Sequence, residues 1–220
     1  MRVVIADYGM GNLRSVQQAV QALGCDAVIS GNPETVARAD RLILPGVGAF
    51  GDAVARLHRL GLDTAVTAAA AGGTPLLGIC LGMQLLLEES LEFGHFEGLG
   101  LIPGRVVPFS RPKTQGLRIP HIGWNSIGAA PDSFVDNLPD SYMYFVHSYH
   151  ADCVPPAFAA ASCTYGYPFV CALQRDHIWG TQFHPEKSGR AGLLVLEHFL
   201  TQPVDKRGGG VDNYDHLSGS

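Results

Sequence analysis

The sequence predicts an α/β fold in which a mostly parallel central sheet carries helices on both faces and an antiparallel β region is appended to it. Three observations lead to this prediction. The chain of 220 residues is 46% apolar and 16% charged, which is enough apolar material to bury a sizeable core. Its first half alternates short apolar runs with helical spacing, and its second half is rich in Pro, Gly and Tyr. We expect one domain over residues 1–201 and a flexible tail over 202–220.

The first half predicts the parallel part of the sheet. Val16, Val20 and Leu23 repeat at helical spacing after the first apolar run, and Gly24 follows as a residue that ends this helix. Strands that alternate with helices are typical of a parallel, flavodoxin-like sheet. The expected strands are Arg2–Ala6, Asp26–Ser30, Arg41–Leu44 and Pro75–Ile79, and the expected helices are Leu13–Leu23, Pro33–Ala39, Asp52–Leu60, Leu62–Ala71 and Leu81–Glu89.

The second half predicts the antiparallel part. Between Gly98 and Val170 the chain shows short β-like runs separated by turn residues. After them Ser188 is placed to cap a last helix that runs to Leu200. The expected strands here are Gly104–Phe109, Met143–His150, Ala157–Cys163 and Ile178–Phe183.

Charge, cysteines and hydropathy exclude several classes of protein. There are 15 Lys and Arg against 20 Asp and Glu, a net charge of −5, so we expect no nucleic acid and no anionic membrane as partner. Five cysteines without a CxxC pair indicate reduced thiols and a cytoplasmic protein. The apolar region Leu62–Leu87 is interrupted by Gly72 and Pro75, so no membrane span is expected.

A cysteine lies where a strand is predicted to give way to a helix, in the segment Gly78-Ile79-Cys80-Leu81-Gly82. This layout is that of the nucleophile elbow G-x-S-x-G, with sulfur in place of oxygen. The start of a helix favours a thiolate, and the backbone N–H of Leu81 is placed to stabilise an oxyanion. The alternative is that Cys80 is only a small buried residue in a tight turn.

A base for this nucleophile is offered by His184 at the end of the predicted strand Ile178–Phe183. Residues two apart in an extended chain point the same way, so Glu186 can accept a hydrogen bond from the far imidazole nitrogen. Alone, the pair would be read as a casual surface ion pair. Together with Cys80 it predicts a Cys-His-Glu triad.

A second oxyanion contribution is expected from Gly46, Val47 and Gly48, which follow the predicted strand Arg41–Leu44. Glycine lets backbone N–H groups approach a ligand closely, although an ordinary strand–helix loop explains the spacing equally well. We expect no metal, because His147 and His150 would point to opposite faces of a strand.

No cofactor is expected either. Gly9 and Gly11 follow the first strand, but Arg14 stands where a dinucleotide-binding fingerprint has its third glycine, and no acidic residue ends the second strand. A GxxxxGK[ST] loop is missing as well. A protein-binding scaffold with an inert site remains an alternative, against which the complete triad argues.

Taken together, these motifs resemble those of the class I (triad) glutamine amidotransferases. The pattern Gly-x-Cys-x-Gly-x-Gln followed by His-Pro-Glu is similar to theirs. Five further stretches resemble the branch of the family that supplies the glutaminase subunit of imidazole glycerol phosphate synthase. They are Asp7-Tyr8-Gly9-Met10-Gly11-Asn12-Leu13, Leu44-Pro45-Gly46-Val47-Gly48-Ala49-Phe50, Pro120-His121-Ile122-Gly123-Trp124-Asn125, Tyr144-Phe145-Val146-His147-Ser148-Tyr149 and Phe183-His184-Pro185-Glu186-Lys187-Ser188.

The resemblance implies a reaction, a substrate and a partner. Cys80 would attack the carboxamide of glutamine and form a thioester, and water would release glutamate. The glutamine would be held by Gln84, Glu92, Ser148 and Tyr149. The ammonia would pass to a (βα)8-barrel cyclase subunit in a heterodimer, with Asn12, Trp124, Tyr144 and Lys187 at the interface. A glutaminase for vitamin B6 synthesis and a γ-glutamyl hydrolase are alternatives within the same superfamily.

Overall fold

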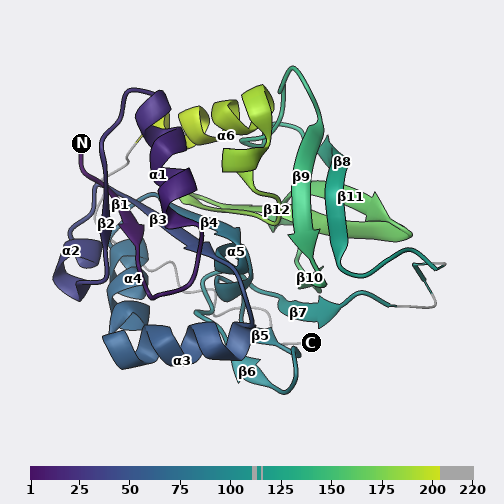
Figure 1. Cartoon of the computed structure of the whole chain (residues 1–220), viewed down its shortest axis with the longest axis horizontal. Helices are drawn as coiled ribbons and strands as arrows, with labels where there is room; N and C mark the ends of the chain where they lie inside the picture. The colour runs from purple at the N-terminus through teal and green to yellow at the C-terminus, as the bar shows by residue number, and fades with distance from the viewer. Residues whose placement is uncertain (111–112, 115, 204–220) are drawn as a thin grey trace, which may run out of the picture.

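The structure is a computed structural model that describes residues 1–110, 113–114 and 116–203 (Figure 1). Apart from residues 202 and 203, the predicted tail lies outside the described residues. The described residues form one sheet of 13 strands. Its parallel part has the order β2-β1-β3-β4-β13, and these strands are Ala27–Ser30, Val3–Ala6, Arg41–Gly46, Leu76–Cys80 and Ile178–Thr181.

Helices cover both faces of the parallel strands, as the sequence predicts. Val3 and Ile5 belong to a core beneath helices α1 (Leu13–Ala22) and α6 (Gly189–Thr201). Val4 and Ala6 face the opposite core, because successive side chains of a strand point to opposite faces. Figure 1 shows α3 and α4 on that second face. The helices of the second core are α2 (Pro33–Ala37), α3 (Phe50–Leu60), α4 (Leu62–Ala71) and α5 (Leu81–Leu85).

The antiparallel region is confirmed, and it continues the parallel sheet instead of forming a separate one. Strand β12 (Tyr167–Arg175) pairs with β13 and with β10 (Tyr149–Asp152), from which β7 (Arg105–Pro108), β5 (Glu89–Ser90) and β6 (Phe96–Glu97) lead on. On a second branch, β12 pairs with β11 (Ala159–Tyr165), then β8 (His121–Ala129) and β9 (Tyr142–His147). Two short 3-10 helices, η1 (Pro156–Phe158) and η2 (Pro185–Lys187), complete the described elements.

Most predicted bounds lie within two residues of the observed ones, so that Gly46 ends strand β3 instead of following it. Two predicted elements differ by more. The helix after Cys80 ends at Leu85, not at Glu89, because the carbonyl groups of Leu85 and Leu86 accept hydrogen bonds from Leu99 and Ile102. The predicted strand Met143–His150 is broken at Ser148 into β9 and β10, which pair with different neighbours. In both places long-range pairing overrides the local pattern.

The predicted cap of the last helix was also wrong. Ser188 does precede α6, but its hydroxyl makes no capping bond to that helix. The hydroxyl donates to the carbonyl oxygen of His184 at 2.7 Å and accepts from the backbone N–H of Tyr144 at 3.0 Å. The side chain therefore ties strand β9 to the segment that follows β13.

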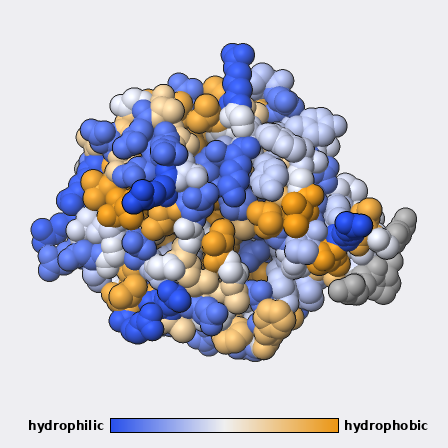
Figure 2. Space-filling view, viewed as in Figure 1, coloured by the Kyte–Doolittle hydropathy of each residue, from blue (hydrophilic) through white to orange (hydrophobic). Residues whose placement is uncertain are grey.

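The described residues form no large apolar patch on the face of the molecule shown in Figure 2, and the cysteines form no disulfide bonds. Figure 2 shows hydrophobic residues scattered among hydrophilic ones over this face of the molecule. All five cysteines are free. Within the described residues, no helix combines the length and the apolar character needed to cross a membrane.

Candidate active site

Cys80 occupies a sharp turn between β4 and α5. Its backbone φ is 55° and ψ is −109°, a conformation that a non-glycine residue rarely adopts. The turn is possible because its flanking residues lack side chains. A Cβ at Gly78 would lie 2.6 Å from the carbonyl oxygen of Gly82, and one at Gly82 would collide with the carbonyl oxygen of Leu44. Cys80 thus has a strained backbone conformation between two glycines, at the carboxyl end of a parallel strand. Nucleophilic residues of α/β enzymes occupy such positions.

His184 and Glu186 lie together directly after β13, the strand beside β4. Nδ1 of His184 is 2.9 Å from Oε1 of Glu186, and both side chains are almost completely buried. A ring whose Nδ1–H is held by a carboxylate presents Nε2 to the other side. Among the described residues, Nε2 of His184 has no hydrogen-bond partner.

The charge state of His184 is set by its neighbours. Burial by itself lowers the pKa of the imidazole, but the side chain of Cys80 and the carboxylate of Glu186 outweigh it and raise the pKa to about 9. At neutral pH the ring therefore carries a proton. The arrangement can hold a thiolate–imidazolium pair that is ready both to attack and to donate a proton.

A cavity of about 320 Å³ opens beside Cys80. Seven other predicted residues line it, namely Val47, Gly48, Leu81, Gln84, Glu92, Ser148 and Tyr149. Gly46 is not among the lining residues, and it lies opposite Cys80 in the register of β3 and β4. Phe93, Val146 and His147 also line it, and sequence reasoning had assigned no role to them.

Glu92 is a buried carboxylate in the wall of this cavity. Burial raises its pKa, and a hydrogen bond of 2.7 Å from the backbone N–H of Phe50 opposes that rise. Phe50 is the first residue of α3, and the N-cap residue Ala49 has no side-chain acceptor of its own. The Glu92 carboxylate therefore supports the start of α3 as well as placing a negative group in the cavity.

Comparison with known proteins assigns the chain to a family. A family model described as glutamine amidotransferase class-I matches residues 4–202. The chain belongs to this family. Its resemblance to the family, inferred from the motifs, is thereby confirmed.

The relatives of this glutamine amidotransferase carry a more specific name. The imidazole glycerol phosphate synthase subunit HisH of Sulfurimonas denitrificans is 49% identical over 199 residues, which cover 90% of this chain and 96% of that one. HisH of Geobacter sulfurreducens is 44% identical over 203 residues, with 90% and 97% covered. At this identity and coverage the relatives show an enzyme, and they confirm the predicted branch of the family.

Solved structures show the shared fold of the glutamine amidotransferase. A crystal structure of a glutamine amidotransferase matches with a TM-score of 0.72 at 18% identity, and covers 90% of this chain and 96% of that one. The structure of PurLQS from Thermotoga maritima matches with a TM-score of 0.71 at 19% identity, with 90% and 97% covered.

A chain of hydrogen bonds leads from strand β8 to the cavity of the glutamine amidotransferase. Nδ1 of His147 is 2.8 Å from the carbonyl oxygen of Tyr149, so Nδ1 must carry the proton and Nε2 must accept. His121 therefore donates from Nδ1 to that Nε2 at 3.0 Å, and Asn125 donates to Nε2 of His121 at 3.3 Å. The whole series works with both rings neutral. Burial agrees, because it lowers the pKa of His121 to about 4 and that of His147 to about 3.

The expected placement of His147 and His150 on opposite faces was wrong. Both rings contact Phe109, at centroid distances of 5.1 and 4.8 Å, because the strand break at Ser148 turns them to the same side. His147 takes part in the chain described above, and the described residues contain no group of three or more His, Cys, Asp or Glu that could hold a metal.

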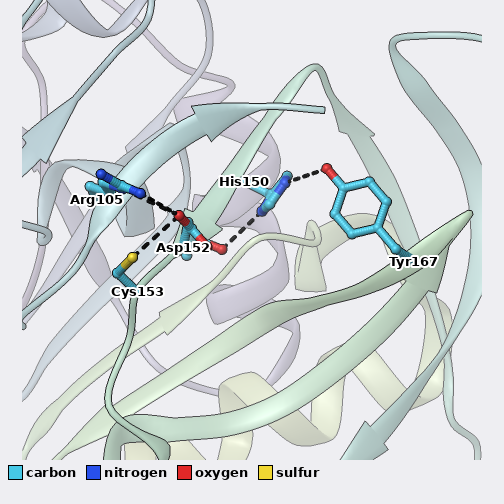
Figure 3. Close-up of polar contacts among 6 residues, drawn as sticks. Arg105, His150, Asp152, Cys153 and Tyr167 are labelled. Carbon is cyan, nitrogen blue, oxygen red and sulfur yellow. Dashed lines mark hydrogen bonds and ion pairs between the residues drawn. The ribbon is translucent and has the colours of Figure 1, made fainter. Parts of the chain in front are cut away.

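His150 belongs to a second polar cluster, which joins strands β7, β10 and β12 (Figure 3). Its Nε2 lies 2.8 Å from the hydroxyl of Tyr167. Next to it, Arg105 pairs with Asp152 at 3.1 Å, and the thiol of Cys153 donates to the same carboxylate at 3.3 Å. None of these side chains lines the cavity beside Cys80.

Three of the four predicted interface residues lie together, with Trp124 on β8, Tyr144 on β9 and Lys187 at the end of η2. Trp124 is 56% exposed and pairs with Tyr144 across the two strands, with ring centroids 6.1 Å apart. Nζ of Lys187 lies 5.8 Å from the centroid of the Tyr144 ring. Asn12 is exposed immediately before α1, on a different element.

The Trp124–Tyr144–Lys187 group is connected to His184 through the backbone. The N–H of His184 donates to the carbonyl oxygen of Tyr144 at 2.9 Å, and Ser188 bridges the same two residues. A shift of β9 would therefore move the base as well.

Gln182 is a residue that the sequence analysis missed. It is completely buried and its amide contacts the sulfur of Cys80. One signal could have found it. Gln182 and His184 are two residues apart in an extended segment, so their side chains point the same way.

Proposed function

We propose that this glutamine amidotransferase hydrolyses glutamine to glutamate and ammonia through a Cys80–His184–Glu186 triad. The observation that carries the proposal is the meeting of a strained elbow cysteine with a buried, carboxylate-held histidine at the carboxyl ends of β4 and β13, next to a cavity. In a parallel sheet this is the edge where substrates bind.

The reaction follows from the charge state of the pair. The Cys80 thiolate attacks the carboxamide carbon, and the resulting oxyanion is stabilised by the backbone N–H of Leu81 and by the Gly46–Gly48 segment. The His184 imidazolium donates its proton to the nitrogen as the C–N bond breaks, so that ammonia leaves and a γ-glutamyl thioester remains. Water, deprotonated by the now neutral ring, attacks the thioester. Glutamate is released and the thiolate–imidazolium pair is restored.

Glutamine would lie in the cavity of about 320 Å³. Glu92 supplies the negative charge that suits the ammonium group of the substrate, and its buried position makes that charge effective. Gln84, Ser148 and Tyr149 line the same wall and would hold the carboxylate and amino groups.

The ammonia would pass to a cyclase subunit, a (βα)8 barrel, that makes imidazole glycerol phosphate and an aminoimidazole carboxamide ribotide in histidine biosynthesis. Two observations support this part of the proposal. The curated relatives are named as subunits of imidazole glycerol phosphate synthase. In addition, the large apolar side chain of Trp124 is exposed next to Tyr144, whose carbonyl oxygen accepts a hydrogen bond from His184. We propose a heterodimer with Trp124, Tyr144, Lys187 and Asn12 on its interface.

The test measures glutamate release from glutamine by the purified chain. It is run alone, with the cyclase subunit, and with the cyclase plus its ribonucleotide ligand, and Cys80→Ala is the control in each condition. Strong stimulation by the liganded cyclase, absent in the variant, is expected. High activity of the lone chain would instead indicate an uncoupled hydrolase. No activity in any condition would contradict the proposal.

A further inference from the structure

Gln182 lies between the substrate wall and the nucleophile. It follows β13 directly and is completely buried, and its backbone N–H is fixed by the carbonyl oxygen of Cys171 at 2.9 Å. Its Oε1 accepts a hydrogen bond from Nε2 of Gln84 at 3.0 Å. Its Nε2 donates to Sγ of Cys80 at 3.7 Å.

The orientation of the Gln182 amide is fixed by the hydrogen-bond network. The carbonyl oxygen of Tyr149 can only accept, so the atom of Gln84 that lies 3.1 Å from it must be the nitrogen. The same nitrogen faces the amide of Gln182, which must therefore present its oxygen. The nitrogen of Gln182 then necessarily points at the sulfur.

We propose that Gln182 is a catalytic residue whose amide N–H stabilises the thiolate of Cys80, an inference that rests on the proposed function. On another side, the sulfur meets the carbonyl oxygen of Val146 at 3.9 Å, which can accept a proton from the thiol but offers nothing to a thiolate. Gln182 does the opposite, because an N–H bond to sulfur is stronger when the sulfur is charged. The two contacts thus favour different protonation states, and Gln182 supports the reactive one.

This role would be used twice in each turnover. The Gln182 N–H keeps the thiolate available before attack in a site that is largely closed to water, where an uncompensated charge is costly. It also stabilises the sulfur when the thioester breaks and the thiolate is the leaving group. Gln84 holds the amide in place, so a side chain in the substrate wall orients the donor.

The experiment measures the rate at which iodoacetamide alkylates Cys80 as a function of pH. It uses the full chain, with the Cys80 peptide quantified by mass spectrometry so that Cys25 and Cys153 do not interfere. It needs neither glutamine nor a partner. The variants are Gln182→Met, which removes the donor at similar volume, and Gln182→Glu, which keeps the acceptor for Gln84 and replaces the N–H by a carboxylate oxygen.

Thr181→Val is the matched control. Thr181 is equally buried, its hydroxyl has no hydrogen-bond partner among the described residues, and valine has nearly the same shape. All variants are first compared with the parent chain by circular dichroism and thermal unfolding. If Gln182→Met does not fold, Gln182→Glu carries the test.

The expected result is a midpoint of the alkylation profile about one pH unit higher in Gln182→Met, which is a tenfold change in the thiol–thiolate equilibrium or about 1.4 kcal/mol. Gln182→Glu should shift it further and Thr181→Val should leave it unchanged. Unchanged profiles in both Gln182 variants, or an equal shift in Thr181→Val, would overturn the proposal. Failure of the proposed function is seen separately, as an absence of glutamate release by the parent chain even in the presence of the liganded cyclase.

Discussion

Gly46 lies directly opposite Cys80 in the register of the parallel strands β3 and β4. A Cβ on Gly46 would collide with the hydroxyl of Tyr8 and would lie 3.0 Å from Cβ of Leu81. The proposed oxyanion segment approaches the nucleophile this closely because Gly46 has no side chain.

Gly46→Ala is therefore expected to lower the free energy of unfolding by about 1–3 kcal/mol, which is the usual cost of overpacking. It is also expected to reduce glutamate release, because the added methyl group displaces the proposed oxyanion segment. The colliding atom is the hydroxyl of Tyr8, which donates to the carbonyl oxygen of Pro45 at 2.8 Å. Tyr8→Phe removes that atom and should restore part of the stability in the double variant. Urea unfolding of the four chains measures the coupling.

Gly128→Ala is the control for this substitution, because a Cβ there would lie 3.8 Å from its nearest neighbour, the Ser162 hydroxyl. It should change the free energy of unfolding by less than about 0.5 kcal/mol. Equal losses in Gly46→Ala and Gly128→Ala would contradict the steric explanation.

The second prediction concerns the titration of His184. With its pKa raised to about 9 above the ordinary 6.5, the group stabilises the folded state fully below pH 6.5, and this contribution is lost as the pH rises through about 9. Glu186→Gln removes one cause of the rise, so the titration should move to lower pH. An NMR titration of the ring Cε1–H measures it, with Glu197→Gln, an exposed position on α6, as the control. The same midpoint in Glu186→Gln and the parent chain would speak against the ion pair.

The third prediction concerns acid stability. The pKa values of His121 and His147 are depressed to about 4 and 3 by burial, so both rings are neutral in the folded state. Stability is fully present above pH 6.5 and falls as the pH drops below it, by up to about 1.4 kcal/mol per pH unit for each proton that only the unfolded chain binds.

His121→Phe keeps the ring stacking on Phe145 and Tyr165 but cannot titrate. Chemical unfolding between pH 4 and 7 should show a shallower slope for this variant, smaller by up to one proton. A slope in His121→Phe as steep as in the parent would show that the buried pair is not responsible.

The fourth prediction concerns the exposed face of β8 and β9. Trp124→Ala should leave the free energy of unfolding within about 0.5 kcal/mol, because the side chain is more than half exposed. It should weaken binding to the cyclase by about 2 kcal/mol or more and uncouple glutamine use from cyclisation. Titration calorimetry and the ratio of glutamate to cyclised product measure the two effects.

Val28→Ala provides the comparison, since Val28 is 46% exposed on β2 at the opposite end of the sheet order. It should bind the cyclase as the parent chain does. Unchanged coupling in Trp124→Ala would remove Trp124 from the interface.

Much of the fold could be predicted because its signals are local. The apolar runs around Val3–Ala6 and Leu76–Cys80 and the helical spacing of Leu62–Ala71 lie where the structure has them. The elbow at Cys80 is also local, since Gly78 and Gly82 frame it within five residues. The ends of α5 and the break at Ser148 could not be predicted, because partners far along the chain decide them.

The elbow cysteine, the His-x-Glu pair and the glycines at a strand end are each encoded by neighbours in the chain, so they could be predicted from the sequence. The contacts between buried polar groups depend on the tertiary structure. Gln182 contacts Cys80 although 102 positions separate them in the chain, and His121 bonds His147 over a separation of 26 positions. No local pattern specifies such meetings, because the direction of a buried amide or imidazole is set by the hydrogen bonds available where distant strands pair.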